Sequence, residues 1–208
     1  MSIISSQALT SVPLYHALGV DPDTGLYQFE DYNGDGNISQ LDDKQRFEDL
    51  APKFYGGLGN IIAYKNFSMD VFFQFKEQKG YNYLRSGATV GFRQNAPVQL
   101  LDRWQAPGDI NPIQRASGLG IYPGVSEADN RQRESSATVS DASFVRLRNI
   151  TLTYKLPQSI NLGLDIDLYL QGQNLFVVTD YEGPDPEQPS FEILPPLQQF
   201  TMGVQVSF

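Results

Sequence analysis

The chain has 208 residues, enough for one large domain or two small ones, with a net charge of −9, no cysteine and one histidine. The missing cysteines exclude disulfides, zinc–thiolate sites and cysteine nucleophiles, and the acidic balance argues against a nucleic-acid partner, because a phosphate-binding surface needs a basic patch. No run of about 18 apolar residues predicts a transmembrane helix, but the alternating strands of a membrane barrel would escape that test.

The first residues, MSIISSQALTSVPLYHALG, lack the basic stretch followed by an apolar stretch that marks a signal peptide. We therefore expect no leader in this sequence. The same segment holds the histidine of the chain, His16. No serine or carboxylate stands near it at a catalytic spacing, so we expect an ordinary surface residue.

The stretch EDYNGDGNISQLDD, residues 30–43, follows the template of a calcium-binding loop. Side chains with oxygen atoms stand at positions 1, 3, 5, 7, 9 and 12, where they can converge on one hard cation, and a glycine at position 6 allows the sharp turn. Position 12 is an aspartate instead of the usual glutamate, so Asp43 is a competing ligand. The pattern predicts a structural calcium site at Asp31, Asn33, Asp35, Asn37 and Asp42, with an Asp/Asn/Gly turn that binds no ion as the alternative.

The flanks of this loop argue against an EF-hand, which needs a helix on each side. The preceding TGLYQFED predicts a strand, and the following QLDDKQRFEDL is compatible with a short helix.

From residue 53 onward, apolar and polar residues alternate with the period of a β-strand. The last segment, FTMGVQVSF, does so without an exception, and FSMDVFFQFK, RLRNITLTYKLP and LDIDLYLQGQN behave alike. The glycine-rich FYGGLGNIIAYK is a weaker example. We predict an all-β fold, an antiparallel meander with strands at residues 53–65, 67–77, 142–156, 163–176 and 199–208.

The connections between these strands alternate in length. The first pair meets at Lys65 and Asn66 and the third and fourth strands meet across PQSINLG, whereas about 60 and about 20 residues form the other two connections. In a meander, alternate connections lie at the same end, so short turns gather at one end and long loops at the other. This polarity is typical of outer-membrane barrels, although a soluble β-sandwich could show it by chance.

Some residues in the loops and on the polar faces are candidates for a site. Trp104 and Tyr122, in the long middle loop, could stack on a sugar ring, or pack against their own loop. Asp165 and Asp167 point the same way, about 7 Å apart, but no pocket is implied, so we predict no catalytic residues and no enzyme. The acidic, proline-rich DYEGPDPE is expected to form a stiff surface loop, with contact to a partner as the alternative.

The motifs DYNGDGNI, PKFYGGLGNIIAYKNFSMDVFFQF, SFVRLRNITLTYKLP and LYLQGQNLFVVTDYEGPDPE, in this order, resemble the C-terminal part of the SusC/RagA family of TonB-linked outer-membrane transporters. The resemblance runs from about Gly19 to the end of the sequence. It implies the last five strands of a transmembrane β-barrel of about 22 strands. Residues 1–52 would then be an extracellular segment with the calcium-type loop, and residues 53–208 the barrel strands with long extracellular loops. The signal peptide, the TonB-contacting segment, the plug domain and the earlier strands are expected outside this sequence.

The family imports large nutrients, typically oligosaccharides and sometimes peptides, with energy from the TonB system. A SusD-like lipoprotein closes over the extracellular mouth of the barrel. The resemblance therefore implies these two partners, an outer-membrane location and contact with its lipid. The last strand resembles the signal that the barrel-assembly machinery recognises, and this signal would comprise Phe200, Met202, Val204, Val206 and Phe208.

A different class of function remains as the alternative, an extracellular calcium-binding β-domain for adhesion or a dockerin-like module. A dockerin would carry a second copy of the Asp-rich loop, and the sequence has one copy. Because five strands leave an open edge on each side and cannot close a barrel, we expect this chain alone to form no pore and to need detergent.

Overall fold

The computed structural model describes residues 8–86, 89, 91–93, 95–118, 121–157, 163–190 and 193–207. The chain forms two compact units. Unit 1 comprises Met1–Ala51, Lys79–Asp141 and Pro189–Glu192, and unit 2 comprises Pro52–Gln78, Ala142–Gln188 and Ile193–Phe208. Within the described ranges, no helix is long and apolar enough to cross a membrane.

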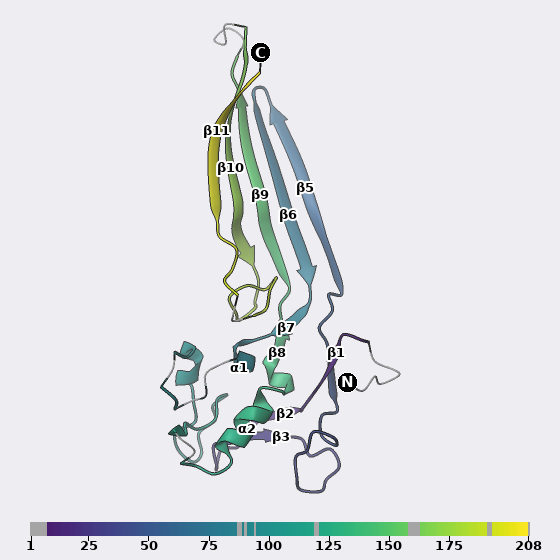
Figure 1. Ribbon diagram of the computed structural model, residues 1–208, viewed down its shortest axis with the longest axis vertical. Coiled ribbons are helices and arrows are strands. Elements are labelled where there is room, and N and C mark those ends of the chain that lie inside the picture. Colours follow the sequence, from purple (N-terminus) through teal and green to yellow (C-terminus); the bar gives the residue numbers. More distant parts are fainter. Residues whose placement is uncertain are drawn as a thin grey trace. The chain divides into compact units, whose positions relative to one another are not determined.

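Unit 2 contains one antiparallel sheet of long strands (Figure 1). The structure forms strands in all five segments in which the sequence alternates, although β10 is shifted toward the C-terminus. The strand order is β11-β10-β9-β6-β5. The strands are β5 (Phe54–Tyr64), β6 (Phe67–Glu77), β9 (Phe144–Lys155), β10 (Asp165–Val178) and β11 (Gln199–Ser207).

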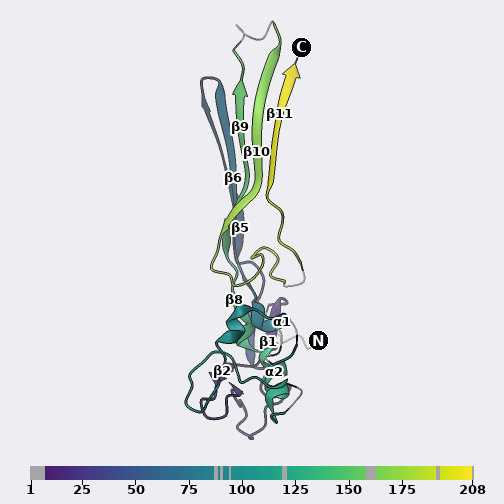
Figure 2. The ribbon, with the colours of Figure 1, turned by 90° about the vertical axis from the view of Figure 1, so that its left-hand side faces the viewer.

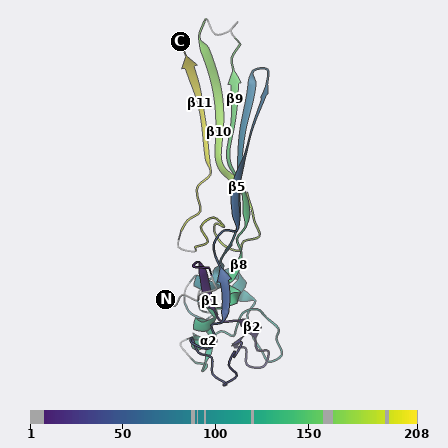
Figure 3. The ribbon, with the colours of Figure 1, turned by 90° about the vertical axis from the view of Figure 1, so that its right-hand side faces the viewer.

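The five strands run side by side in a single layer (Figures 2 and 3). A tight turn joins β5 to β6 at Lys65, whose φ of 52° lies in the left-handed region. This turn and the end of β11 lie at the same end of the sheet, and the long excursion between β10 and β11 lies at the other (Figure 1). The ends of the sheet therefore differ as the lengths of the connections predict.

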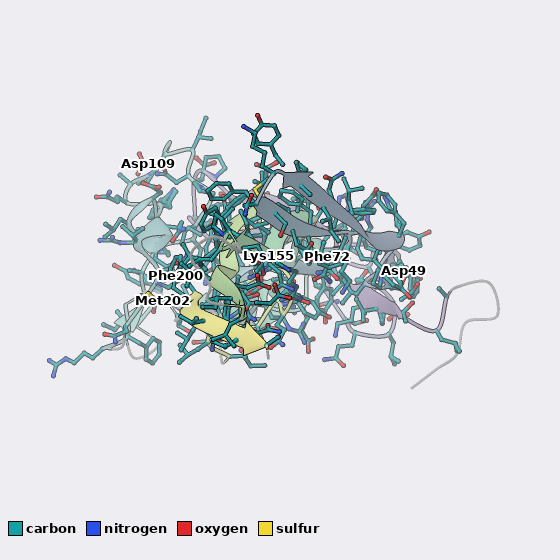
Figure 4. The ribbon with its side chains drawn as sticks, turned by 90° about the horizontal axis from the view of Figure 1, so that it is seen from above. Asp49, Phe72, Asp109, Lys155, Phe200 and Met202 are labelled. Carbon is teal, nitrogen blue, oxygen red and sulfur yellow. The ribbon has the colours of Figure 1, made fainter. Side chains whose placement is uncertain are left out.

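The strand register separates two faces. Met69, Leu152, Leu170 and Met202 form one row across four neighbouring strands, whereas the next row comprises Asp70, Thr151, Gln171 and Thr201. The apolar row is open within the unit, since the exposed fraction is 52% for Leu170 and 80% for Met202. Phe200 and Met202 project from the same side of β11 (Figure 4). The sheet thus has an uncovered apolar face and a polar face.

Unit 1 is built from short elements around a small core. The core comprises Tyr15, Tyr27, Phe29 and Ala128, which come from the N-terminal segment and the middle segment of the chain. Three two-stranded sheets pair β1 with β4, β2 with β3 and β7 with β8. The elements are β1 (Ser11–Leu14), β2 (Ala17–Val20), β3 (Tyr27–Phe29), β4 (Arg46–Asp49), β7 (Lys79–Tyr81), α1 (Tyr83–Ser86), η1 (Val98–Leu101), α2 (Val125–Gln132), η3 (Ser136–Thr138) and β8 (Val139–Asp141).

The sequence predicts a single division of the chain, after residue 52, whereas unit 1 also includes the middle segment Lys79–Asp141. The middle segment joins the N-terminal one because the two segments share hydrogen bonds: Tyr15 N–H donates to the carbonyl of Glu134 at 3.0 Å, and Ser136 N–H donates to the carbonyl of Tyr15 at 2.8 Å. The strand expected before the calcium-type loop is β3. The expected short helix after the loop is absent from the described residues 40–50, because Arg46–Asp49 pairs with β1 as β4.

Candidate functional site

The calcium-type loop, residues 31–43, is shaped by carboxylates that accept hydrogen bonds from its own backbone. Asp31 accepts from the N–H groups of Gly34 and Gly36 at 2.8 and 2.7 Å, and Asp35 accepts from the N–H of Asn37 at 2.7 Å. Gly34 and Gly36 have φ angles of 72° and 84°, which glycine adopts without steric cost. The residues at positions 1 and 5 of the template therefore fix the turn.

Asp43 closes the loop from its far end. This carboxylate is buried and accepts from the N–H of Ser39 at 2.6 Å and of Tyr32 at 2.7 Å. The hydrogen bond from Ser39 lowers the pKa of Asp43, and the bond from Tyr32 acts in the same direction. Asp43 is thus engaged with the backbone, whereas its neighbour Asp42 accepts a hydrogen bond from the Ser39 hydroxyl at 2.9 Å.

The donors of this loop suit a hard cation, because carboxylate, amide and hydroxyl oxygens are the ligands that calcium prefers. Asn33 and Asp35 lie in contact, with Nδ2 3.1 Å from Oδ2. Among the residues that the structure describes, no three His, Cys, Asp or Glu side chains gather into a metal-binding group. The chemistry of the donor set fits calcium, and the ion itself stays a prediction.

Trp104 lies in the interior of unit 1, which differs from the exposed position that stacking on a sugar would need. The residue is 4% exposed, and its indole N–H donates to the carbonyl of Pro22 at 2.9 Å. Gly25 lies against the ring so closely that a Cβ there would be 2.4 Å from Cδ2. Arg115 stacks over Trp104 at 4.8 Å and over Tyr122 at 3.7 Å. Tyr122 is 44% exposed and keeps an accessible ring.

The other candidates from the sequence are spread over both units. His16 pairs with Glu30 at 2.8 Å at the surface of unit 1. On β10, Asp165 lies 3.4 Å from Lys155, and Asp167 is one polar row away from it, so the two acids have different surroundings. In the assembly signal, Phe208 lies outside the described residues. The other members are exposed along one face of β11, namely Phe200, Met202, Val204 and Val206.

The structure also contains a charged cluster that the motifs did not predict, which we call the latch: Arg146, Arg148, Asp185 and Glu187. Arg146 Nη2 lies 2.6 Å from Asp185 Oδ1, and both side chains are almost fully buried, at 5% and 4% exposure. Arg148 pairs with Glu187, and these two side chains are 27% and 25% exposed. A hollow of about 280 Å³ beside this pair is lined by Arg148, Asp185, Glu187, Gln188, Leu194 and Pro196.

Comparisons with known proteins concern the chain as a whole, and no family model matches it. Among curated proteins, TonB-dependent receptor P3 of Formosa agariphila is 32% identical over 212 residues, which cover 92% of this chain and 20% of the receptor. Receptors P39 and P26 of the same organism are 31% and 30% identical, over 86% and 80% of this chain and 18% and 16% of their own lengths. The chain thus spans about a fifth of its curated relatives.

Solved structures agree on the fold. The RagAB peptide transporter matches with a TM-score of 0.71 and 24% identity, over 94% of this chain and 22% of the matched chain. The RagAB peptide importer in its open-open state matches with a TM-score of 0.70 over the same shares. The sequence matches confirm the resemblance to TonB-linked transporters and the predicted location, and the structural matches agree on a RagAB-like fold: the chain is a segment of a TonB-dependent receptor, a family of outer-membrane proteins.

Proposed function

We propose that the chain forms part of the barrel wall and the outer loops of a SusC/RagA-type transporter that imports large nutrients across the outer membrane. The sheet with two unlike faces carries this proposal. Its uncovered apolar rows match the needs of lipid contact, and its polar rows match those of a wet lumen. In this role the protein is a transporter and not an enzyme.

We further propose the partners that such a transporter needs: the TonB system as the source of energy, a SusD-like lipoprotein over the outer loops, and the barrel-assembly machinery. The similarity to TonB-dependent receptors supports the first, and the similarity to RagAB supports a lipoprotein. Oligosaccharides are the proposed substrate class, with peptides as the second class, as in the RagAB peptide importer. Uptake of a labelled oligosaccharide and of a labelled peptide by cells that make the intact transporter distinguishes the two.

Calcium is proposed as a structural ion of the outer segment. The oxygen donors of residues 31–43 support it, since weak affinities, about 10⁻⁴ to 10⁻³ M, suffice for extracellular sites. Titration calorimetry of the intact transporter should detect calcium binding that is lost in Asp35→Ala and kept in Asp109→Ala, a matched aspartate outside the loop. Equal heats in the two variants, or no heat in the parent, would contradict the proposal.

The alternative, a soluble calcium-binding β-domain, is not favoured, because TonB-dependent receptor P3 matches 92% of this chain and not only its calcium-type loop. A labelling experiment decides between the two. Leu170→Cys on the apolar face and Gln171→Cys on the polar face are introduced one at a time into an intact transporter whose other cysteines have been replaced; the 208 residues of this chain contribute none.

A fluorophore attached to the Leu170→Cys variant should be quenched by brominated lipid in outer membranes, and a fluorophore attached to the Gln171→Cys variant should be unaffected. The paired design is informative because residues 170 and 171 are adjacent but belong to opposite faces of β10. Equal quenching at both positions, or quenching at neither, would refute the proposed role of the sheet.

A further inference from the structure

Residues 179–188, which we call the strap, fold back onto the sheet at the start of the excursion between β10 and β11. The Thr179 hydroxyl donates to the carbonyl of Ser143 at 2.7 Å, and the Gln78 side chain donates to the carbonyl of Pro186. Tyr181, Asp185 and Pro186 are buried. Burial raises the pKa of Tyr181 to about 12, and nearby Asp185 adds to this shift. The strap is therefore a packed element, unlike the surface loop expected from its sequence.

The latch joins the strap to the polar face of the sheet. A register shift at Arg148 interrupts the alternation of β9, so that Arg146 pairs with Gln74 of β6, on the polar face. Its two arginines stand two apart on β9, and its two acids stand two apart on the strap. Arg146 binds Asp185, and its Nε, which has no hydrogen-bond partner among the described residues, lies 3.9 Å from Glu187. Glu187 therefore helps to neutralise both arginines.

Arg148 also ties the strap to the strands on either side of β9. Its guanidinium donates to Gln74 of β6, to Asn174 of β10 at 3.1 Å and to Glu187 of the strap. The Glu187 N–H donates to Asp185 Oδ1 at 2.8 Å, which holds the two acids in one arrangement. Because each member fixes another, the ion pairs should form and break together rather than one by one.

The strap has few intermediate positions open to it. Pro184 and Pro186 flank Asp185 and restrict the backbone there. A buried arginine that lost its acid would remain without compensation, so a half-released strap is unfavourable. The hollow of about 280 Å³ beside Arg148 and Glu187 leaves room for these two side chains to move when the latch opens.

We propose that the latch makes the strap a size-limiting gate on the polar face, closed while both ion pairs hold and open once they break. The inference rests on the proposed function, under which the polar face lines the passage for nutrients. Arg146 and Arg148 act here as positioning residues. Arg146 and Arg148 of β9 bind the acids of the strap, and Gln78, just past the end of β6, donates to Pro186. Gln74 of β6 and Asn174 of β10 accept from Arg148 and so hold it in place under the strap, which is the arrangement that a closed gate requires.

The test uses the intact transporter in outer membranes, with Glu187→Gln and Arg148→Met as two independent ways to break the outer pair. Hydrogen exchange of residues 179–188 should become at least tenfold faster in both variants. Lys155→Met is the matched control, because it removes a cation from β9 that pairs with Asp165 and not with the strap. The double variant with the two charges swapped, Arg148→Glu with Glu187→Arg, should restore part of the protection of residues 179–188 from hydrogen exchange.

The gate is measured in the Gln171→Cys variant by the reaction of its thiol with a small and a bulky water-soluble maleimide. Breaking the latch should raise the rate for the bulky reagent about tenfold and change the rate for the small one little. Unchanged exchange would overturn the latch, and faster exchange without a change in the ratio of rates would overturn the gate. A failure of the proposed function would give a different result from a failure of the gate. Brominated lipid would then quench the fluorophore in the Gln171→Cys variant, or would fail to quench it in the Leu170→Cys variant.

Discussion

Replacement of Leu170 by arginine is the most direct energetic test of the apolar face. Leu170 lies near the middle of β10, between Leu152 on β9 and Met202 on β11, and is 52% exposed. If this face contacts lipid, Leu170→Arg transfers a cation into hydrocarbon, which costs about 2–4 kcal/mol near the midplane of the bilayer. That cost corresponds to an approximately 30- to 700-fold change in the folding equilibrium, at about 1.4 kcal/mol for each factor of ten.

The matched control is Gln171→Arg, one residue along the same strand. Gln171 pairs with Thr151 and Thr201 on the polar face, so arginine there keeps access to water and should change the free energy of unfolding by no more than about 0.5 kcal/mol. The measurement is reversible guanidinium unfolding of the intact transporter in lipid vesicles. Equal destabilisation by the two substitutions, or none by Leu170→Arg, would refute the assignment of the faces.

Three other predictions concern the latch, the core of unit 1 and the calcium-type loop. Asp185→Ala leaves Arg146 buried without its acid and should destabilise unit 2 by about 3–5 kcal/mol in denaturant unfolding, whereas Asp185→Ala with Arg146→Met should cost less than the sum of the single changes. Gly25→Ala places a Cβ against the ring of Trp104 at a backbone φ of 70° and should lower the midpoint of unfolding, followed by the fluorescence of Trp104. The control Gly108→Ala should lower the midpoint less, because a Cβ at residue 108 has no other atom within 4 Å. The pKa of Asp43 is lowered in the folded state, so its carboxylate stabilises the loop above the unfolded pKa of about 3.9, and this stabilisation is lost as the pH falls through the folded pKa. Asp43→Asn should therefore reduce the protection of the Tyr32 and Ser39 amides from hydrogen exchange at pH 7 and have no effect on it below the folded pKa.

The strands of unit 2 could be predicted because their pattern is local. Each alternates over its own length, so the rows through Met69, Leu152 and Met202 follow from the sequence once the strands pair. The meander adds short turns such as the one at Lys65, which bring neighbouring strands together without long-range information. The β10 bounds were the least accurate, because the glycine and asparagine residues near its end obscure the pattern.

The latch could not be predicted because its members lie 39 residues apart in the sequence. A signal was nevertheless present. The two arginines, Arg146 and Arg148, are two residues apart, as are the two acids, Asp185 and Glu187. Two cations on a strand need acidic partners if that part of the sheet is covered. Periodicity reveals neither the register shift at Arg148 that pairs Arg146 with Gln74 on the polar face nor the loop that covers this face, so DYEGPDPE was expected at the surface.

Unit 1 shows a different limit of sequence reasoning. The residues around Phe47 are compatible with a helix in isolation, but pairing with β1 and the ion pairs of Glu48 with Arg46 and Lys79 favour a strand. Trp104 is similar, because its burial depends on Gly25, which lies far away in the sequence. Tertiary contacts decided both outcomes, and short segments in a small core carry too little local pattern to reveal them.

The sheet of unit 2 demands different surroundings on its two sides, and this asymmetry ties the fold to the proposed function. In the described part of unit 2 the strands form a single sheet, so no second sheet there covers the rows of Leu170 and Met202. The polar face differs, since the strap covers part of it and supplies acids to buried arginines. As far as the structure describes the chain, β5 and β11 also pair on one side only, which leaves backbone groups for further strands. A lipid-facing wall that continues into a larger barrel satisfies all three demands at once, whereas a soluble domain would need a separate apolar layer and two protected edges.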